Sequence, residues 1–167
     1  SSSTRESSRA VVTASGRHRE ATRHTRPSRV SRRPTRVDPG VAMLRIGKAD
    51  LCRLIPHDGT MCLLDTVEQW DDTSIMCTTA SHRDATNPLR RDNQMEAICG
   101  LEYAAQAMAV HVGLLDQGKE RRLTVGYLGA VKNLMLRASR LDDVKGDLRV
   151  QATRLVGEAG CFIYTFR

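Results

Sequence analysis

The chain has 167 residues, 40% of them hydrophobic, which is enough for one domain with a buried core. Its formal net charge of +7 is confined to residues 1–42, which hold ten Arg against three acidic residues, whereas residues 43–167 hold sixteen residues of each sign. The neutral balance of residues 43–167 argues against a strongly basic folded domain, which is the usual electrostatic basis of nucleic-acid binding.

Residues 1–42 contain no Leu, Ile, Met or aromatic residue. Such a segment cannot bury enough apolar surface to offset the entropy lost on ordering, so we expect it to be disordered. Three functions are compatible with this Arg-rich segment. They are a nucleic-acid-binding arm, an organellar transit peptide and a twin-arginine export signal around "SRRPTR". No apolar stretch follows those arginines, which argues against the export signal. The simplest interpretation is that translation begins at Met43 and that residues 1–42 are upstream sequence.

The first half of the remaining chain predicts a short helix and a pair of strands. Residues 49–59 predict a helix that Pro56 stops, followed by a turn. Residues 60–71 and 73–82 predict two strands, the second with alternating Ser and Thr, and a loop over residues 83–97 follows. This order places the loop directly before the most apolar segment of the chain.

Residues 98–115 predict one long helix. Because this helix is apolar on nearly all sides, we expect other structure to wrap around it. Glu102 and Gln106 lie four residues apart and share one face. His111 is rotated off that face, so we interpret it as a packing or helix-end histidine. These three polar residues interrupt the apolar run, which argues against a membrane span.

Three further strands follow the helix. They are predicted over residues 121–140, 146–158 and 160–167, and the first of them contains an irregular turn with glycine. One helix packed on one antiparallel sheet is an α+β architecture. We therefore expect a single soluble domain over residues 43–167.

The five cysteines form no C-x-x-C pair, so their spacing indicates neither a disulfide framework nor a zinc site. We expect buried thiols in a reducing compartment, and therefore a cytoplasmic protein with no metal site. The cysteines are Cys52, Cys62, Cys77, Cys99 and Cys161.

The stretches "LIPHDGTMCLLDTVEQWDDTSIMC" and "GLEYAAQAMAVH" resemble the hotdog-fold 3-hydroxyacyl-acyl-carrier-protein dehydratases of the FabZ/FabA type. With "NPL" in the intervening loop, the chain is most similar to the ApeP-like dehydratases of aryl polyene gene clusters. The resemblance covers residues 44–167. It implies an antiparallel sheet wrapped around one long central helix, with a further strand expected after residue 167, so that the domain is truncated at its C-terminus.

The resemblance implies dehydration of 3-hydroxyacyl thioesters to trans-2-enoyl thioesters, in fatty-acid or aryl polyene type biosynthesis. This reaction needs a base for the α-proton and an acid for the leaving hydroxyl. Glu102 is the predicted acid. The family's "GHFPG" histidine is absent from the loop "TNPLRRDNQMEA", so His57 and His82 are the candidate bases, with His57 favoured.

Further site residues are implied by the same resemblance. Substrate contacts are expected at Asn87, Gly100 and Gln106. The substrate is carried on the phosphopantetheine of an acyl carrier protein, so no other cofactor is expected. Carrier proteins in this chemistry are acidic, which makes the paired arginines on loops the candidate docking residues. These are Arg90, Arg91, Arg121 and Arg122.

The missing loop histidine leaves two alternative functions open. A hotdog thioesterase would use the carboxylate of Glu102 to activate water, and a non-catalytic acyl-binding subunit would need no base. The chain is compatible with a homodimer and with a heterodimer in which a second hotdog subunit supplies the histidine of a composite site. No membrane association is expected, and nucleic acid is an unlikely partner.

Overall fold

The computed structural model describes residues 8–15, 45–116, 125–158 and 161–167. Within them, one long helix, α2, packs against an antiparallel sheet of seven strands in the order β2-β3-β4-β6-β7-β1-β5. The strands are β1 (Ser8–Ser15), β2 (Ile46–Gly47), β3 (Thr66–Trp70), β4 (Ser74–Thr79), β5 (Val125–Lys132), β6 (Leu148–Glu158) and β7 (Cys161–Phe166). The helices are α1 (Lys48–Leu51) and α2 (Gly100–Leu115).

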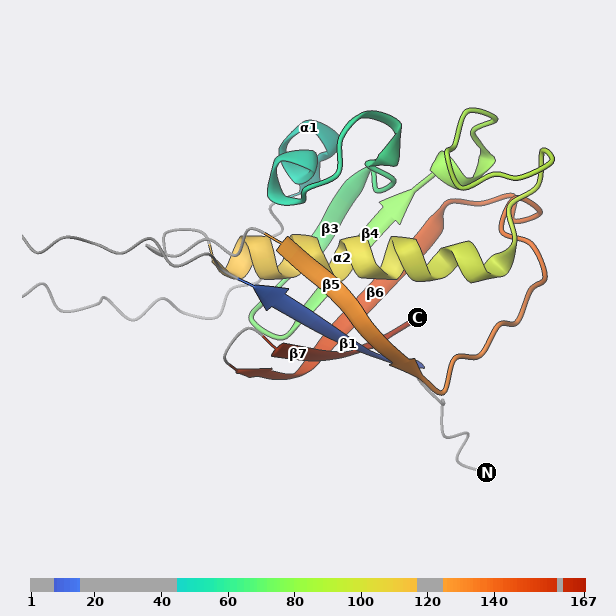
Figure 1. The fold of residues 1–167 in the computed structure, drawn as a ribbon. Helices are drawn as coiled ribbons and strands as arrows, with labels where there is room; N and C mark the ends of the chain where they lie inside the picture. Colours follow the sequence, from blue (N-terminus) through green and yellow to red (C-terminus); the bar gives the residue numbers. More distant parts are fainter. Residues whose placement is uncertain (1–7, 16–44, 117–124, 159–160) are drawn as a thin grey trace, which may run out of the picture.

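The sheet curves around α2. In Figure 1, β3, β4 and β6 pass behind the helix while β5 crosses in front of it. Two antiparallel hairpins, β3–β4 and β6–β7, supply consecutive strands, and β4 pairs with β6 to join them. One helix enclosed by one antiparallel sheet confirms the predicted α+β class and the hotdog architecture.

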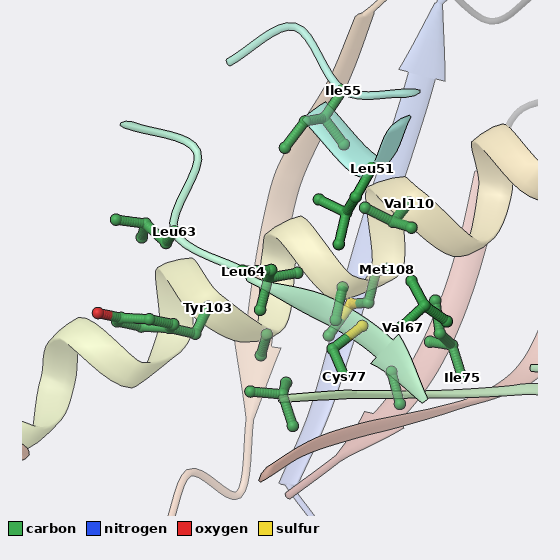
Figure 2. Close-up of a cluster of buried hydrophobic side chains, with 14 of the residues drawn as sticks. Leu51, Ile55, Leu63, Leu64, Val67, Ile75, Cys77, Tyr103, Met108 and Val110 are labelled. Atoms are coloured by element: carbon green, nitrogen blue, oxygen red, sulfur yellow. The ribbon is translucent and has the colours of Figure 1, made fainter. Parts of the chain in front are cut away.

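Alternation along β4 sets which face of the sheet meets the helix. Ile75, Cys77 and Thr79 are buried and their neighbours are only partly so, as expected for a strand with one face on a core. Figure 2 shows Ile75 and Cys77 beside Val67 of β3 and Met108 of α2. The predicted strand over residues 60–71 is shorter than expected, since a 3-10 turn at Gly59–Met61 delays β3 until Thr66.

The core extends to the segment that precedes β3. Leu51 of α1 is completely buried, as are Leu63 and Leu64. Figure 2 places all three against α2, so the predicted short helix at the start of the domain packs on one side of the central helix. Fully burying one leucine side chain contributes roughly 1.5–3 kcal/mol, so these contacts fix the position of α1 and the loop after it.

The composition of α2 reflects its central position. By length and composition, residues 97–115 would also suit a membrane span, but about half of that segment is buried inside the domain. Its two buried polar side chains, Gln106 and His111, are both hydrogen-bonded to the surrounding structure. We therefore interpret α2 as the core helix of the fold.

His111 is a structural histidine, in agreement with its interpretation from the sequence. Its ring is completely buried, and its Nε2 donates to the carbonyl oxygen of Asp71 at 2.8 Å. Because a carbonyl can only accept, Nδ1 is the acceptor for the hydroxyl of Tyr164, also at 2.8 Å. The ring thus joins the β3–β4 turn to β7 in its neutral form.

We expect His111 to make stability depend on pH. Burial lowers the pKa of His111 below its ordinary value of 6.5. The unfolded chain therefore binds a proton more readily than the folded one, so the free energy of unfolding should fall as pH drops below about 6.5. Urea unfolding at pH 7 and pH 5.5 should show a larger loss in the wild type than in His111→Gln. Equal losses in the two proteins would contradict this role, and His57→Gln, at a partly exposed position, is the control.

The first strand of the sheet comes from the segment that we expected to be disordered. Ser8–Ser15 forms β1, which is antiparallel to β7 on one side and to β5 on the other. The prediction for residues 1–42 is therefore wrong over this strand, and the other residues of the segment lie outside the described structure. Main-chain hydrogen bonds hold such a strand between two neighbours without requiring large apolar side chains, which explains why composition did not reveal it.

This strand also changes the expectation for β7. The resemblance implied a missing strand beyond residue 167 and hence an unpaired edge on β7. In the structure β1 covers that edge, and the edge strands of the described sheet are β2 and β5. The polar groups of β7 are thus paired on both sides.

Two cysteines are not free thiols, contrary to our expectation. Cys52 and Cys62 form a disulfide with a Cα–Cα distance of 5.9 Å. The ten-residue spacing matches no recognised motif, so the disulfide could not be predicted from the cysteine pattern. The return of the chain after Pro56 brings the two residues together. Cys77 is buried, and burial raises the pKa of its thiol to about 12.

Candidate active site

The structure brings His57 and Glu102 into contact within one chain. His57 lies in the turn after Pro56, and Glu102 lies in the first turn of α2. Nε2 of the imidazole is 3.3 Å from Oε1 of the carboxylate, with 29% and 34% of the respective side chains exposed. The pair is therefore partly buried but open to solvent on one side, as a substrate site requires.

Gln106 fixes the carboxylate and the loop at the same time. Its Nε2 donates to Oε1 of Glu102 at 3.0 Å and to the carbonyl oxygen of Met61 at 2.8 Å. Its Oε1 accepts from the backbone N–H of Leu63 at 3.0 Å. The side chain is completely buried and its amide is satisfied by these partners, so Gln106 positions other groups. Its predicted contact with substrate stays a prediction.

Gly59 allows the turn that carries His57. Its φ of +59° lies in the left-handed region, where a side chain would be strained. Within this turn the N–H of Met61 donates to the carbonyl oxygen of Asp58 at 3.2 Å. The turn predicted from "HDG" is therefore present, and it directs the chain back to Gln106.

His57 has one free ring nitrogen. Nδ1 is buried and has no hydrogen-bond partner among the described residues. A catalytic histidine is commonly oriented by a hydrogen bond to this second nitrogen. Here the ring is oriented instead by the path of its loop and by the contact of Nε2 with Glu102.

A neutral imidazole beside a carboxyl group can perform acid–base chemistry. One group can accept a proton while the other donates one, and the two lie 3.3 Å apart, close enough to act on one substrate. Within the described residues no cluster of three or more His, Cys, Asp or Glu side chains is arranged to hold a metal ion. The chemistry that this arrangement supports is proton transfer at a partly buried site.

The loop residue Asn87 is not at this site. It is 6% exposed, and its Nδ2 donates to the hydroxyl of Tyr103 at 2.9 Å and to the carbonyl oxygen of Ser81 at 2.8 Å. Burial raises the pKa of the Tyr103 phenol, which therefore stays protonated in this network. The side chain of Asn87 holds the loop to α2, and its predicted substrate contact stays a prediction.

The second candidate base, His82, is structural as well. Its ring is completely buried, and Nε2 donates to the carbonyl oxygen of Val144 at 3.0 Å. No hydrogen bond or ion pair joins it to Glu102 in the described part of the chain. Of the two histidines weighed from the sequence, the structure places only His57 beside the carboxylate.

The four predicted docking arginines fall into three groups. Arg90 is 14% exposed and its guanidinium pairs with Asp142 at 3.0 Å, so it holds the loop together and is unsuited to docking. Arg91 is exposed. Arg121 and Arg122 lie outside the described residues. The side-chain hydrogen bonds from the Arg140 guanidinium hold the pKa of Asp142 well below its usual range.

Gly100 begins α2 and lines an apolar cleft of about 200 Å³. Leu101 and Ala104 line the same cleft, together with residues of the β5–β6 connection. Ala104 and Glu102 are about 200° apart around the helix, so the cleft lies on the side of α2 away from the carboxylate. An added Cβ on Gly100 would reach Leu141 only at 3.9 Å, so sterics alone do not require glycine here. Its predicted substrate contact stays a prediction.

The chain is similar to known dehydratases in sequence and in structure. The sequence profile of the ApeP-like family, described as ApeP dehydratase, matches residues 49–167. The structure is similar to a chain of the dehydratase heterocomplex ApeI:P from Xenorhabdus doucetiae, with a TM-score of 0.57 and 18% sequence identity over 70% of this chain and 88% of that chain. None of the curated proteins matches.

Proposed function

Because the chain belongs to the ApeP-like dehydratase family, we propose that it removes water from a 3-hydroxyacyl thioester carried on an acyl carrier protein, with His57 and Glu102 as its acid–base pair. The observation that carries this proposal is the 3.3 Å contact between the two side chains. The products are a trans-2-enoyl thioester and water. Fatty-acid or aryl polyene type biosynthesis in the cytoplasm is the proposed setting.

The pair accounts for both proton transfers of the elimination. Neutral His57 takes the α-proton of the thioester, and protonated Glu102 gives its proton to the departing hydroxyl, which leaves as water. The reaction leaves an imidazolium beside a carboxylate. Passage of one proton from His57 to Glu102 restores the starting state, so the contact that defines the site also closes the cycle.

Hydrolysis and non-catalytic binding are the competing functions. A thioesterase would use Glu102 to activate water and would release a free acid. A non-catalytic subunit has no use for an imidazole next to a carboxyl group, and both groups are present here. The geometry therefore favours dehydration over the non-catalytic alternative.

A second hotdog subunit is the proposed partner. On the solvent side of α2, Ile98 is 42% exposed, and Leu101, Ala105 and Ala109 are partly exposed. This apolar strip lies next to Glu102, so a subunit packed on it would cover one side of the acid–base pair. The similar structure is a heterocomplex, which supports a heterodimer. Since the chain already holds His57, the partner need not supply the base.

The carrier protein is proposed to approach through exposed arginines. Arg91 follows the partly buried Arg90 on the loop before α2 and is the one described residue of the predicted docking set that is free to meet an acidic surface. This docking would change the rate of association more than the chemical step.

A product assay tests the proposed function. The chain is incubated with a 3-hydroxyacyl thioester of a carrier protein, first alone and then with a hotdog subunit encoded next to it. Mass spectrometry of the carrier should show loss of one water. Release of free acid would replace the proposal by a thioesterase. Unchanged substrate under both conditions would overturn catalysis by this chain.

A further inference from the structure

A disulfide encloses the turn that carries the acid–base histidine. Cys52 lies in the 3-10 turn Cys52–Leu54, and Cys62 follows the 3-10 turn Gly59–Met61, ten residues later. His57 stands midway between the two sulfurs along the chain. The bond therefore closes a small covalent ring around one half of the site.

The ends of this ring are anchored to α2 by other contacts. At one end Leu54 packs so closely on α2 that a Cβ added to Gly113 would lie 3.1 Å from the Leu54 carbonyl oxygen. At the other end the side chain of Gln106 forms hydrogen bonds with the backbone of both Met61 and Leu63. Between these anchors the chain reverses direction at a solvent-exposed turn.

The turn itself has few contacts that would orient the imidazole. Ile55 packs in the core at the start of the turn. Among the described residues, no hydrogen bond joins residues 56–60 to the helix or the sheet, and the contact of His57 with Glu102 is their one polar side-chain contact. Nδ1 of His57 has no partner. The orientation of the His57 imidazole therefore depends on the conformation of the loop, which the disulfide restricts.

The disulfide is placed where a reductant can reach it. Cys62 is 2% exposed, whereas Cys52 is partly exposed. An incoming thiolate can attack the sulfur of Cys52 and release that of Cys62 as the leaving thiolate. A structural disulfide buried at both sulfurs would resist this exchange.

We propose that the Cys52–Cys62 disulfide positions His57 for catalysis and makes the site responsive to protein dithiols of the thioredoxin type. This inference rests on the proposed function of His57 and Glu102. On reduction the S–S bond breaks and accepts two electrons and two protons from the dithiol, whose own sulfurs become a disulfide. The loop then samples more conformations, and His57 spends less time beside Glu102.

The expected effect is a loss of turnover with little change in substrate binding. Reduction should lower kcat about 10-fold while KM changes less than 2-fold, because the anchors at Leu54 and Gln106 remain in place. In a His57→Ala background the residual rate should not respond to reduction. A purely structural disulfide would change the rate of both proteins, so this comparison separates the two roles.

The test uses the full chain, with its partner subunit if activity requires one. Activity is measured after oxidation and after treatment with thioredoxin and its reductase, and alkylation under denaturing conditions counts free thiols in each sample. Five cysteines occur in the sequence, so three adducts are expected when oxidised and five when reduced. Cys52→Ser should reproduce the reduced rate without added reductant, and Cys161→Ser, at an exposed cysteine, is the matched control.

The outcomes separate this inference from the proposed function. Equal turnover in both redox states, or five adducts under oxidising conditions, would overturn the inference and leave the dehydratase proposal intact. Absence of dehydration in every sample would overturn the proposed function and the inference with it. Melting temperatures of Cys52→Ser and the wild type identify any loss of fold, and the reduced wild type tests the idea without a substitution.

Discussion

Glu102→Gln is expected to lower the rate of dehydration at least about 100-fold, because the amide cannot donate an acidic proton to the leaving hydroxyl. The fold should be unchanged. The glutamine has nearly the same volume, and its Oε1 can still accept the hydrogen bond from Nε2 of Gln106. Single-turnover measurements with the carrier-bound substrate report the chemical step, and circular dichroism with a melting curve reports the fold.

The matched control is Glu96→Gln. Glu96 is exposed and lies just before the turn that leads into α2, so the substitution removes the same charge near the same helix end. We expect it to keep nearly full activity. If Glu102→Gln and Glu96→Gln retained similar rates, Glu102 would have no part in the mechanism.

Deletion of residues 1–15 is expected to lower the melting temperature by several degrees or more. Among the described strands β5 pairs only with β1, and β7 depends on β1 for one of its two partners. Without β1 the edge of β7 is exposed and β5 has no partner in the sheet, so backbone groups on both lose their hydrogen bonds. A fall of about 4–8 °C corresponds to roughly 1 kcal/mol in a small domain.

A deletion of residues 1–7 is the control, since it leaves the whole of β1 in place. Hydrogen exchange measured on both truncated proteins should show faster exchange in β5 and β7 only when residues 8–15 are absent. Equal melting temperatures and equal exchange in the two truncated proteins would show that β1 does not stabilise the sheet.

The sequence was most informative where periodicity and burial coincide. The helix over residues 98–115 and the alternation in β4 follow from the spacing of apolar residues, and the fold class follows from their order. Resemblance added Glu102 and, less firmly, His57. Their contact depends on how the turn after Pro56 folds back onto α2, which spacing along the chain does not specify.

Two other predicted site residues have structural contacts that the sequence did not reveal. Asn87 and Gln106 are polar residues near the site in sequence, but both are buried and satisfied by structural hydrogen bonds. Only three-dimensional contacts distinguish such a residue from one that binds substrate. β1 was missed because a strand held on both sides by main-chain hydrogen bonds needs little hydrophobic composition.

The position of β1 in the sheet has a consequence for synthesis on the ribosome. This strand is made before every other described element, whereas its neighbours β5 and β7 both follow α2 in the chain and β7 is the last described strand. Helix α2 and the β3–β4 hairpin can begin to associate while the chain is still growing, but β1 must wait until β7 has been made. Closing so long a loop is slow, so we expect the final step of folding to be the insertion of β1 between two strands that have already emerged.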